Sequence, residues 1–131
     1  MNQARLKDLP FFSSMSEEDL AAVAQQTDEF SVAAGRVLAR EGDLGEEFFV
    51  IESGTAEVTR GGAPVAKLGA GDFFGEIALI REDRRTATVT ATSPMVLIVM
   101  TGSSFRSLDR SIPELRDTVS KALAERRAPV S

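Results

Sequence analysis

The sequence has 131 residues, of which 43% are hydrophobic and 27% are charged, and its formal net charge is −5. This length and balance predict one globular domain with a single core. The acidic charge argues against broad electrostatic attraction to nucleic acid or to an anionic membrane. The sequence contains neither histidine nor cysteine, which excludes disulfides, thiolate or imidazole metal sites, and the Ser-His and Cys-His nucleophile pairs. We therefore expect no metal ion and no enzyme of these classes.

The apolar runs and the N-terminus bear on cellular location. The longest apolar run, around Met95 to Met100, has the length of a strand and not of a membrane span. The N-terminus is polar and has no signal-peptide pattern. We therefore expect a cytoplasmic protein without direct membrane contact.

Residues 1–27 are expected to form an N-terminal helical part. Ser16 precedes three acidic residues, so it is predicted to cap a helix that ends near Thr27. Leu20, Val23 and Ala24 would share one face of this helix. We expect that face to pack on the outside of a β-barrel.

Residues 28–100 show short apolar segments separated by glycines, a pattern typical of an antiparallel sandwich or barrel. The predicted strands lie around residues 30–32, 37–38, 48–51, 56–58, 65–68, 86–92 and 95–100. Gly61-Gly62 is the candidate for a hairpin turn, because both residues tolerate positive φ. Phe73 and Phe74 are expected to fill the barrel.

Residues 101–127 are expected to form C-terminal helices. A short helix is predicted over residues 101–108, capped by Thr101 or Ser103. A second helix is predicted from the capping-box pattern that begins at Ser111 to about residue 127. Its apolar residues would form a narrow stripe.

Two neighbouring motifs carry the candidate chemistry, Phe74-Gly75-Glu76-Ile77-Ala78-Leu79 and Arg84-Arg85-Thr86-Ala87-Thr88-Val89. A helical turn that begins at a glycine presents backbone N–H groups that attract anions. An arginine facing that turn can hold the same anion through two parallel hydrogen bonds. A carboxylate beside a bound phosphate makes sense if it accepts hydrogen bonds from a sugar hydroxyl. The two motifs therefore predict a nucleotide that is bound through phosphate and ribose without catalysis.

These motifs resemble the phosphate-binding cassette of cyclic nucleotide-binding domains. Such domains occur in regulatory subunits of cyclic-nucleotide-dependent kinases, in gated channels and in bacterial catabolite activators. The resemblance covers most of the chain and implies a mainly β fold, an antiparallel jelly-roll barrel with N-terminal helices and a C-terminal lid helix. It places the cassette at residues 74–89. It further implies a non-enzymatic sensor of a 3′,5′-cyclic nucleotide, cAMP rather than cGMP, that relays binding through movement of its helices.

The resemblance also implies roles for single residues of the cassette. Arg85 falls at the position of the phosphate-binding arginine, and Glu76 at that of the acceptor for the ribose 2′-hydroxyl. Gly75, Ile77 and Ala78 would contribute backbone N–H groups to the phosphate or the ribose. The next residue, Thr86, has two interpretations: its hydroxyl contacts a phosphate oxygen or a guanine amino group, or it lies in solvent as an ordinary strand residue.

The last predicted helix is the lid in this family. Leu123 would lie on the face of the purine, with Arg126 or Arg127 near its edge. The alternative is that Leu115, Val119 and Leu123 only pack on the barrel or pair with another chain.

Two alternative functions remain open. The chain can be a protein-interaction domain that has kept the fold and lost the ligand, or the excised cytosolic sensor domain of a channel or transporter. The partners would be a cyclic nucleotide and a protein effector or a channel or transporter domain. With the lid helix ending near residue 127, the sequence leaves no room for a helix-turn-helix, so we expect no direct binding to nucleic acid.

Overall fold

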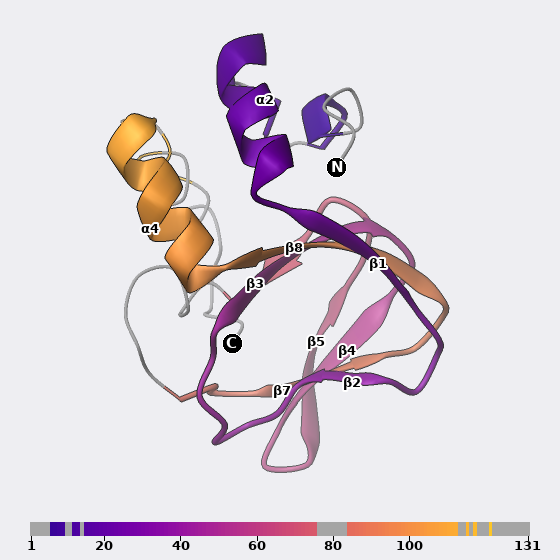
Figure 1. Ribbon diagram of the computed structural model, residues 1–131. Helices are drawn as coiled ribbons and strands as arrows, with labels where there is room; N and C mark the ends of the chain where they lie inside the picture. Colours follow the sequence, from indigo (N-terminus) through magenta and orange to yellow (C-terminus); the bar gives the residue numbers. More distant parts are fainter. Residues whose placement is uncertain are drawn as a thin grey trace.

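Two four-stranded antiparallel sheets form the body of the protein, with strand orders β1-β8-β3-β6 and β2-β7-β4-β5. The computed structural model describes residues 6–9, 12–13, 15–75, 84–112 and the single positions 115, 117 and 121. This is the mainly β, antiparallel jelly roll that was expected, and Figure 1 shows the two sheets enclosing a common interior. The strands are β1 Asp28–Val32, β2 Val37–Ala39, β3 Glu47–Ser53, β4 Ala56–Arg60, β5 Ala63–Leu68, β6 Phe73–Phe74, β7 Thr88–Ala91 and β8 Met95–Thr101.

Two helices, α2 (Glu17–Gln25) and α4 (Gly102–Ser111), lie on the side of β8 and β3, away from β2 and β7 (Figure 1). Ser16 caps α2 as predicted, because its side chain accepts a hydrogen bond from the backbone N–H of Asp19 at 3.1 Å. Thr101, one of the two predicted caps, does the same for α4 by accepting from the backbone N–H of Ser104 at 3.1 Å. Both helices therefore begin where a side-chain oxygen satisfies a free N–H group.

The end of α4 differs from the prediction. Ser111, expected to begin a new helix, is the last residue of α4, and Ile112 is its C-cap in an extended conformation. The N–H of Ile112 donates to the carbonyl of Leu108 at 2.8 Å, which continues the helical bonding by one turn beyond the expected end. Leu115 is helical and buried. Val119 and Leu123 lie outside the described residues.

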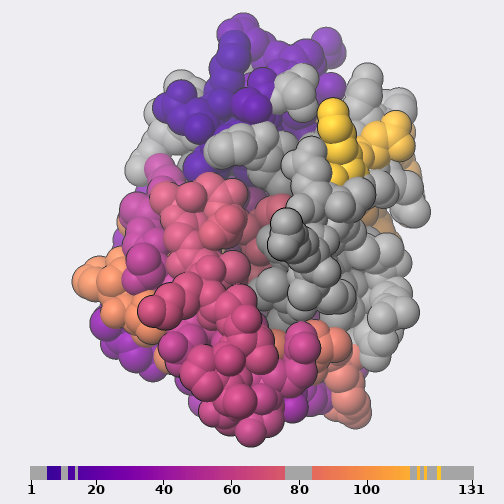
Figure 2. Space-filling model, turned by 180° about the vertical axis from the view of Figure 1, so that it is seen from behind, coloured from indigo at the N-terminus to yellow at the C-terminus, as the bar shows by residue number. Residues whose placement is uncertain are grey.

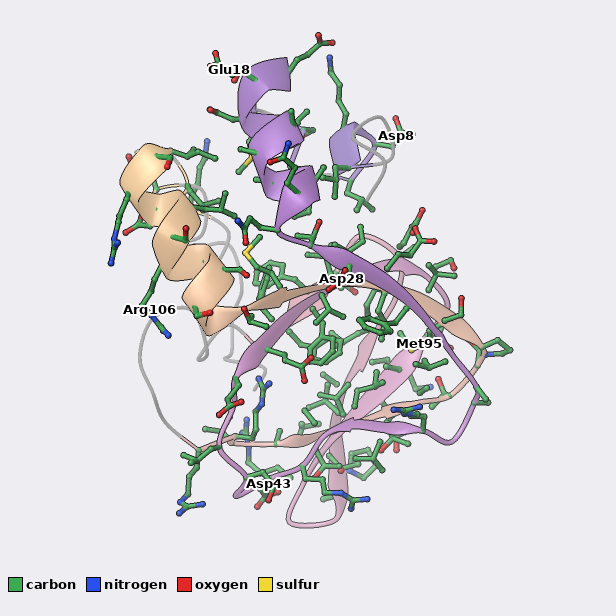
Figure 3. All side chains as sticks on the ribbon, in the orientation of Figure 1. Asp8, Glu18, Asp28, Asp43, Met95 and Arg106 are labelled. Atoms are coloured by element: carbon green, nitrogen blue, oxygen red, sulfur yellow. The ribbon has the colours of Figure 1, made fainter. Side chains whose placement is uncertain are left out.

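The space between the sheets is filled by apolar side chains of both sheets. Figure 3 shows these side chains between the strands, with Met95 among them. They come from alternate positions of the strands, which is the period that places one face inward. The alternation predicted for β7 is confirmed, since Val89 and Ala91 are buried while Thr88 and Thr90 are only half-buried. The interior residues are Ala39, Phe49, Ile51, Ala56, Val58, Leu68, Phe74, Ala87, Val89, Ala91, Met95, Leu97 and Val99.

A second apolar cluster lies between the β1-β8-β3-β6 sheet and the helices. Its members are Leu6, Leu9, Phe12, Met15, Leu20, Val23, Ala24, Phe48, Val50, Phe73, Ile98, Met100, Phe105, Leu108, Ile112 and Leu115. The strands β3 and β8 are consequently buried on both faces, which explains their continuous apolar sequences. Leu20, Val23 and Ala24 of α2 pack here, on the outside of the barrel, as predicted.

The expectation that both adjacent phenylalanines fill the barrel is wrong for Phe73. Phe74 lies between the sheets and stacks on Phe49, with ring centroids 4.6 Å apart. Phe73 lies on the other face of the same sheet, under the helices, 5.7 Å from the ring of Phe48. Successive residues of a strand point to opposite faces, and here both faces are covered, so both rings are buried.

Candidate functional site

Arg85 is the one charged residue that is buried in the part of the chain that the structure describes, with 6% of its surface exposed. It precedes β7, in the second half of the cassette. Its Nη2 donates to the backbone carbonyl of Glu47, at the start of β3, at 2.7 Å. A buried cation is stable only when it is hydrogen-bonded, and this bond fixes one edge of the guanidinium plane. Arg85 is thus held in one orientation by the main chain of a different strand.

Two buried glycines make room for this guanidinium. A Cβ at Gly45 would lie 2.7 Å from Arg85 Nε and 2.8 Å from Cζ. A Cβ at Gly75 would lie 2.6 Å from Arg85 Nη1 and 2.5 Å from the Glu47 carbonyl oxygen. Gly75 also has a φ of 80°, which side-chain-bearing residues rarely adopt. The Arg85 side chain therefore lies between two glycines. No larger residue can replace either glycine without displacing the arginine.

The loop between β2 and β3 is tied to the segment that carries Arg85. The N–H of Gly42 donates to the Arg85 carbonyl at 2.9 Å, and the N–H of Arg85 donates to the Asp43 carbonyl at 2.7 Å. Arg84 Nη1 donates to the Gly42 carbonyl at 2.7 Å, and Leu44 forms a bridge with Arg84. The main chain on both sides of Arg85 is thus fixed by a second loop.

A cavity of about 260 Å³ opens beside Arg85, bordered by β2 and the loop that follows it. The charged residues that line it are Arg85 and Arg40 together with the acidic residues Asp43, Glu46 and Glu47. Asp43 lies in the β2–β3 loop, at the end of the barrel away from the helices (Figure 3). Arginine guanidinium groups suit a phosphate, and carboxylates suit hydroxyl groups, so the lining is suited to a ligand that carries both.

Of the predicted site residues, the structure brings Gly75 and Arg85 together across a gap of nine positions in the sequence. Thr86 follows Arg85 and is exposed, and its carbonyl accepts a hydrogen bond from Arg60 Nε at 3.1 Å. The predicted phosphate and ribose contacts Glu76, Ile77 and Ala78 lie outside the described residues. The same is true of the predicted lid residues Leu123, Arg126 and Arg127.

Sequence reasoning missed the residues that position Arg85. In the sequence, Gly45 is only one of the glycines that separate the apolar segments. The backbone carbonyl of Glu47 has no sequence pattern that identifies it as a partner. Glu47 precedes Arg85 by 38 positions, so only the pairing of strands brings them together.

The described residues form neither a metal-binding cluster nor a membrane-spanning helix. Over residues 6–9, 12–13, 15–75, 84–112, 115, 117 and 121, no three metal-ligating side chains gather into a group that could hold an ion. No helix in these ranges has the length and apolar character needed to cross a bilayer.

A comparison with protein families gives one match that spans most of the β-sheet region. The family model described as a cyclic nucleotide-binding domain matches residues 29–111, more than half of the chain. The matched range includes both glycines around Arg85, Arg85 itself and the whole of α4.

Curated relatives show the same relationship. Over 119 residues the chain is 37% identical to a cyclic nucleotide-gated potassium channel of Rhizobium etli, covering 91% of this chain and 33% of the channel. Over 104 residues it is 39% identical to the cAMP-dependent protein kinase regulatory subunit of Eremothecium gossypii, covering 79% of this chain and 23% of that subunit. The chain spans a third or less of the length of these two relatives.

Solved structures agree with this fold. The regulatory domain of Toxoplasma gondii PKA, crystallised with cAMP, superimposes with a TM-score of 0.81 at 31% identity. The alignment covers 95% of this chain and 49% of that one. The similarity therefore extends over nearly the whole chain.

Proposed function

The chain belongs to the cyclic nucleotide-binding domain family, and on that premise we propose that it is a non-enzymatic sensor of a 3′,5′-cyclic nucleotide, preferably cAMP. The observation that carries the proposal is the buried Arg85, held by the Glu47 carbonyl and flanked by Gly45 and Gly75. The two glycines leave room for the guanidinium at the edge of the cavity that Arg85 lines. An arginine oriented in advance binds a phosphate without first losing side-chain entropy.

In the proposed binding mode, the cyclic phosphate is held by the Arg85 guanidinium and by backbone N–H groups of Gly75, Ile77 and Ala78. Glu76 accepts a hydrogen bond from the ribose 2′-hydroxyl. A guanidinium binds a phosphate through two parallel charge-assisted hydrogen bonds. The partial positive charge at the N-terminus of a helix would also attract the phosphate. The purine is covered by the last helix, with Leu123 on its face and Arg126 or Arg127 at its edge.

The preference for cAMP rests on two supports. The Eremothecium gossypii relative is named as a cAMP-dependent regulatory subunit, and the Toxoplasma gondii structure contains cAMP. A preference for cGMP would depend on the exposed Thr86, whose hydroxyl oxygen would accept a hydrogen bond from the guanine amino group. The proposal is that Thr86 makes no such bond.

We further propose that ligand binding moves the helices. The cassette begins with Phe74 and Gly75. The residue before it, Phe73, packs in the cluster that also contains Phe105 of α4 and Val23 of α2. A shift at the start of the cassette would therefore change the packing of both helices. A ligand that binds better to one of the two arrangements shifts their populations by its difference in affinity. Residues 28–100 would hold the phosphate and the ribose. Residues 101–127 would cover the purine and, with residues 1–27, carry the response.

Thermal melting with cAMP, cGMP and linear AMP tests the proposal. Ligand at 100-fold above its dissociation constant should stabilise the folded state by about 2.7 kcal/mol, which raises Tm by roughly 10 °C for a domain of this size. The rise is expected with the cyclic nucleotides, larger for cAMP, and not with linear AMP. No rise with either cyclic nucleotide would refute the proposal and favour a protein-interaction domain.

The Arg85→Ala variant tests the phosphate contact. Removing the guanidinium should weaken cAMP binding by about 2–5 kcal/mol, because a buried phosphate would lose its charged partner. Arg106→Ala is the matched control, since Arg106 projects outward from α4 (Figure 3). Equal affinities of Arg85→Ala and wild type by calorimetry would remove the phosphate assignment.

The Glu76→Ala variant tests the ribose contact. It should weaken binding of cAMP and leave binding of 2′-deoxy-cAMP nearly unchanged, because the deoxy ligand lacks the hydroxyl. An equal loss for both ligands would show that the carboxylate has another role.

A second candidate function is favoured by the similarity to the Rhizobium etli channel. There the chain would be the cytoplasmic sensor part of a channel or transporter, and its effector would be the rest of that protein. This candidate shares the ligand of the first and differs only in what the helices act upon.

A further inference from the structure

The strand pairings that hold β7 stop short of Arg85. The β4–β7 ladder ends at the pair Thr59–Thr88, and the β2–β7 ladder ends at Ala39–Val89. Arg85 lies three positions before Thr88, outside both ladders. Its segment consequently needs other contacts to keep a fixed position.

Two side chains extend these ladders toward Arg85. Arg60, the last residue of β4, donates from Nε to the carbonyl of Thr86 at 3.1 Å. On the other side, Glu41 follows β2, and its N–H donates to Thr88 Oγ1 at 3.0 Å. Each ladder therefore continues past its last strand pair by one bond that involves a side chain.

The same two residues are joined through the β4–β5 turn. The N–H of Gly61 donates to Glu41 Oε1 at 2.9 Å. Gly61 and Gly62 have φ values of 58° and 82°, the conformation predicted for a tight hairpin turn, and this turn is exposed. In Figure 2 the β4–β5 hairpin, in pink, forms much of the lower surface of the protein.

These bonds close a ring. Arg60 is covalently linked to Gly61, whose N–H donates to the Glu41 carboxylate. Glu41 is linked to Gly42, whose N–H donates to the Arg85 carbonyl. Arg85 is linked to Thr86, and the Thr86 carbonyl accepts a hydrogen bond from Arg60 Nε, which completes the ring. A closed ring resists displacement of any one member more than separate bonds do, because moving one member strains all the others.

We propose that Glu41 and Arg60 are positioning residues for the cyclic phosphate: they brace the Arg85 segment against the β4–β5 turn and thereby keep its guanidinium in register with the ligand. The inference rests on the proposed function. Binding groups have to be held within about 0.5 Å of their productive geometry by residues behind them, and this ring occupies that place behind Arg85. Neither Glu41 nor Arg60 lines the cavity beside Arg85.

Binding measurements on exposed-site variants test the brace. Glu41→Ala and Arg60→Ala should each weaken cAMP binding by about 5- to 20-fold, the scale expected for a residue that acts on coupled contacts at a distance. Glu41→Gln should bind within about 2-fold of wild type, because its amide oxygen can still accept from the Gly61 N–H. Glu57→Ala, in the same hairpin and paired in register with Lys67, is the matched control.

A second measurement separates positioning from general stability. The two diastereomers of the cyclic phosphorothioate carry sulfur in place of one or the other exocyclic oxygen, so the ratio of their affinities reports where Arg85 sits. Glu41→Ala should change this ratio, and Glu57→Ala should not. Wild-type affinity and an unchanged ratio in both Glu41→Ala and Arg60→Ala would overturn the proposal.

Amide hydrogen exchange tests the brace without any ligand. The N–H of Gly42 bonds to Arg85 within the ring, and the N–H of Arg85 bonds to Asp43 beside it. Both N–H groups should exchange about tenfold faster in Glu41→Ala than in Glu41→Gln. Equal exchange in the two variants would overturn the brace. If exchange rises as expected while wild type binds no cyclic nucleotide, the brace stands and the proposed function fails.

Discussion

The Gly45→Ala variant tests whether ligand binding depends on the position of the Arg85 guanidinium, because it shifts that group without removing it. Gly45 does not have a positive φ, so alanine fits the backbone at this position without strain. The added Cβ would lie 2.7 Å from Arg85 Nε, whereas ordinary contact begins at 3.4 Å, so the guanidinium has to move by about 0.7 Å. That movement lengthens or breaks the 2.7 Å bond to the Glu47 carbonyl, a bond to a charged group worth about 1.5–3 kcal/mol.

The expected result is a loss of cAMP affinity with the protein still folded. A misplaced guanidinium should bind the phosphate about 10- to 100-fold more weakly, or ~1.4–2.8 kcal/mol by calorimetry. The free energy of unfolding without ligand should fall by about 1–3 kcal/mol, the usual cost of overpacking. Gly69→Ala is the control, since a Cβ there meets nothing within 4 Å and the φ is not positive. Wild-type affinity in Gly45→Ala would refute the idea that ligand binding depends on where the glycines place Arg85.

Three further predictions concern the fold and are measured by urea unfolding. Gly75→Ala should cost about 2–5 kcal/mol, because the new side chain is strained at a φ of 80° and collides with a backbone carbonyl. Thr101→Ala should cost about 1 kcal/mol through loss of the α4 cap, and Thr101→Ser should restore most of it. Phe74→Ala should cost about 3–5 kcal/mol, whereas Leu44→Ala, at a position 64% exposed, should change the free energy by less than about 0.5 kcal/mol. Similar losses at these last two positions would contradict the assignment of Phe74 to the interior.

Local features of the fold were predictable because short-range chemistry decides them. Ser16 and Thr101 cap helices since a hydroxyl three residues before a free N–H satisfies it whatever the rest of the chain does. The Gly61-Gly62 turn was predictable because few residue pairs tolerate two positive φ values. The assignment of Phe73 to the barrel interior failed because adjacent residues of a strand point to opposite faces. Its burial comes from helices that cover the outer face, and strand alternation does not predict that cover.

By itself, the sequence determined the family, the jelly-roll architecture and the pairing of a glycine turn with an arginine as the candidate phosphate site, because these depend on residue types at fixed spacings. Only the tertiary structure decided how that arginine is held. Its partner is a main-chain carbonyl 38 positions away, its space is made by two glycines on different segments, and its brace comes from a hairpin turn. Every residue has a backbone carbonyl, and free space has no residue type. No pattern of side chains can therefore predict such contacts, which form only when strand pairing brings the segments together.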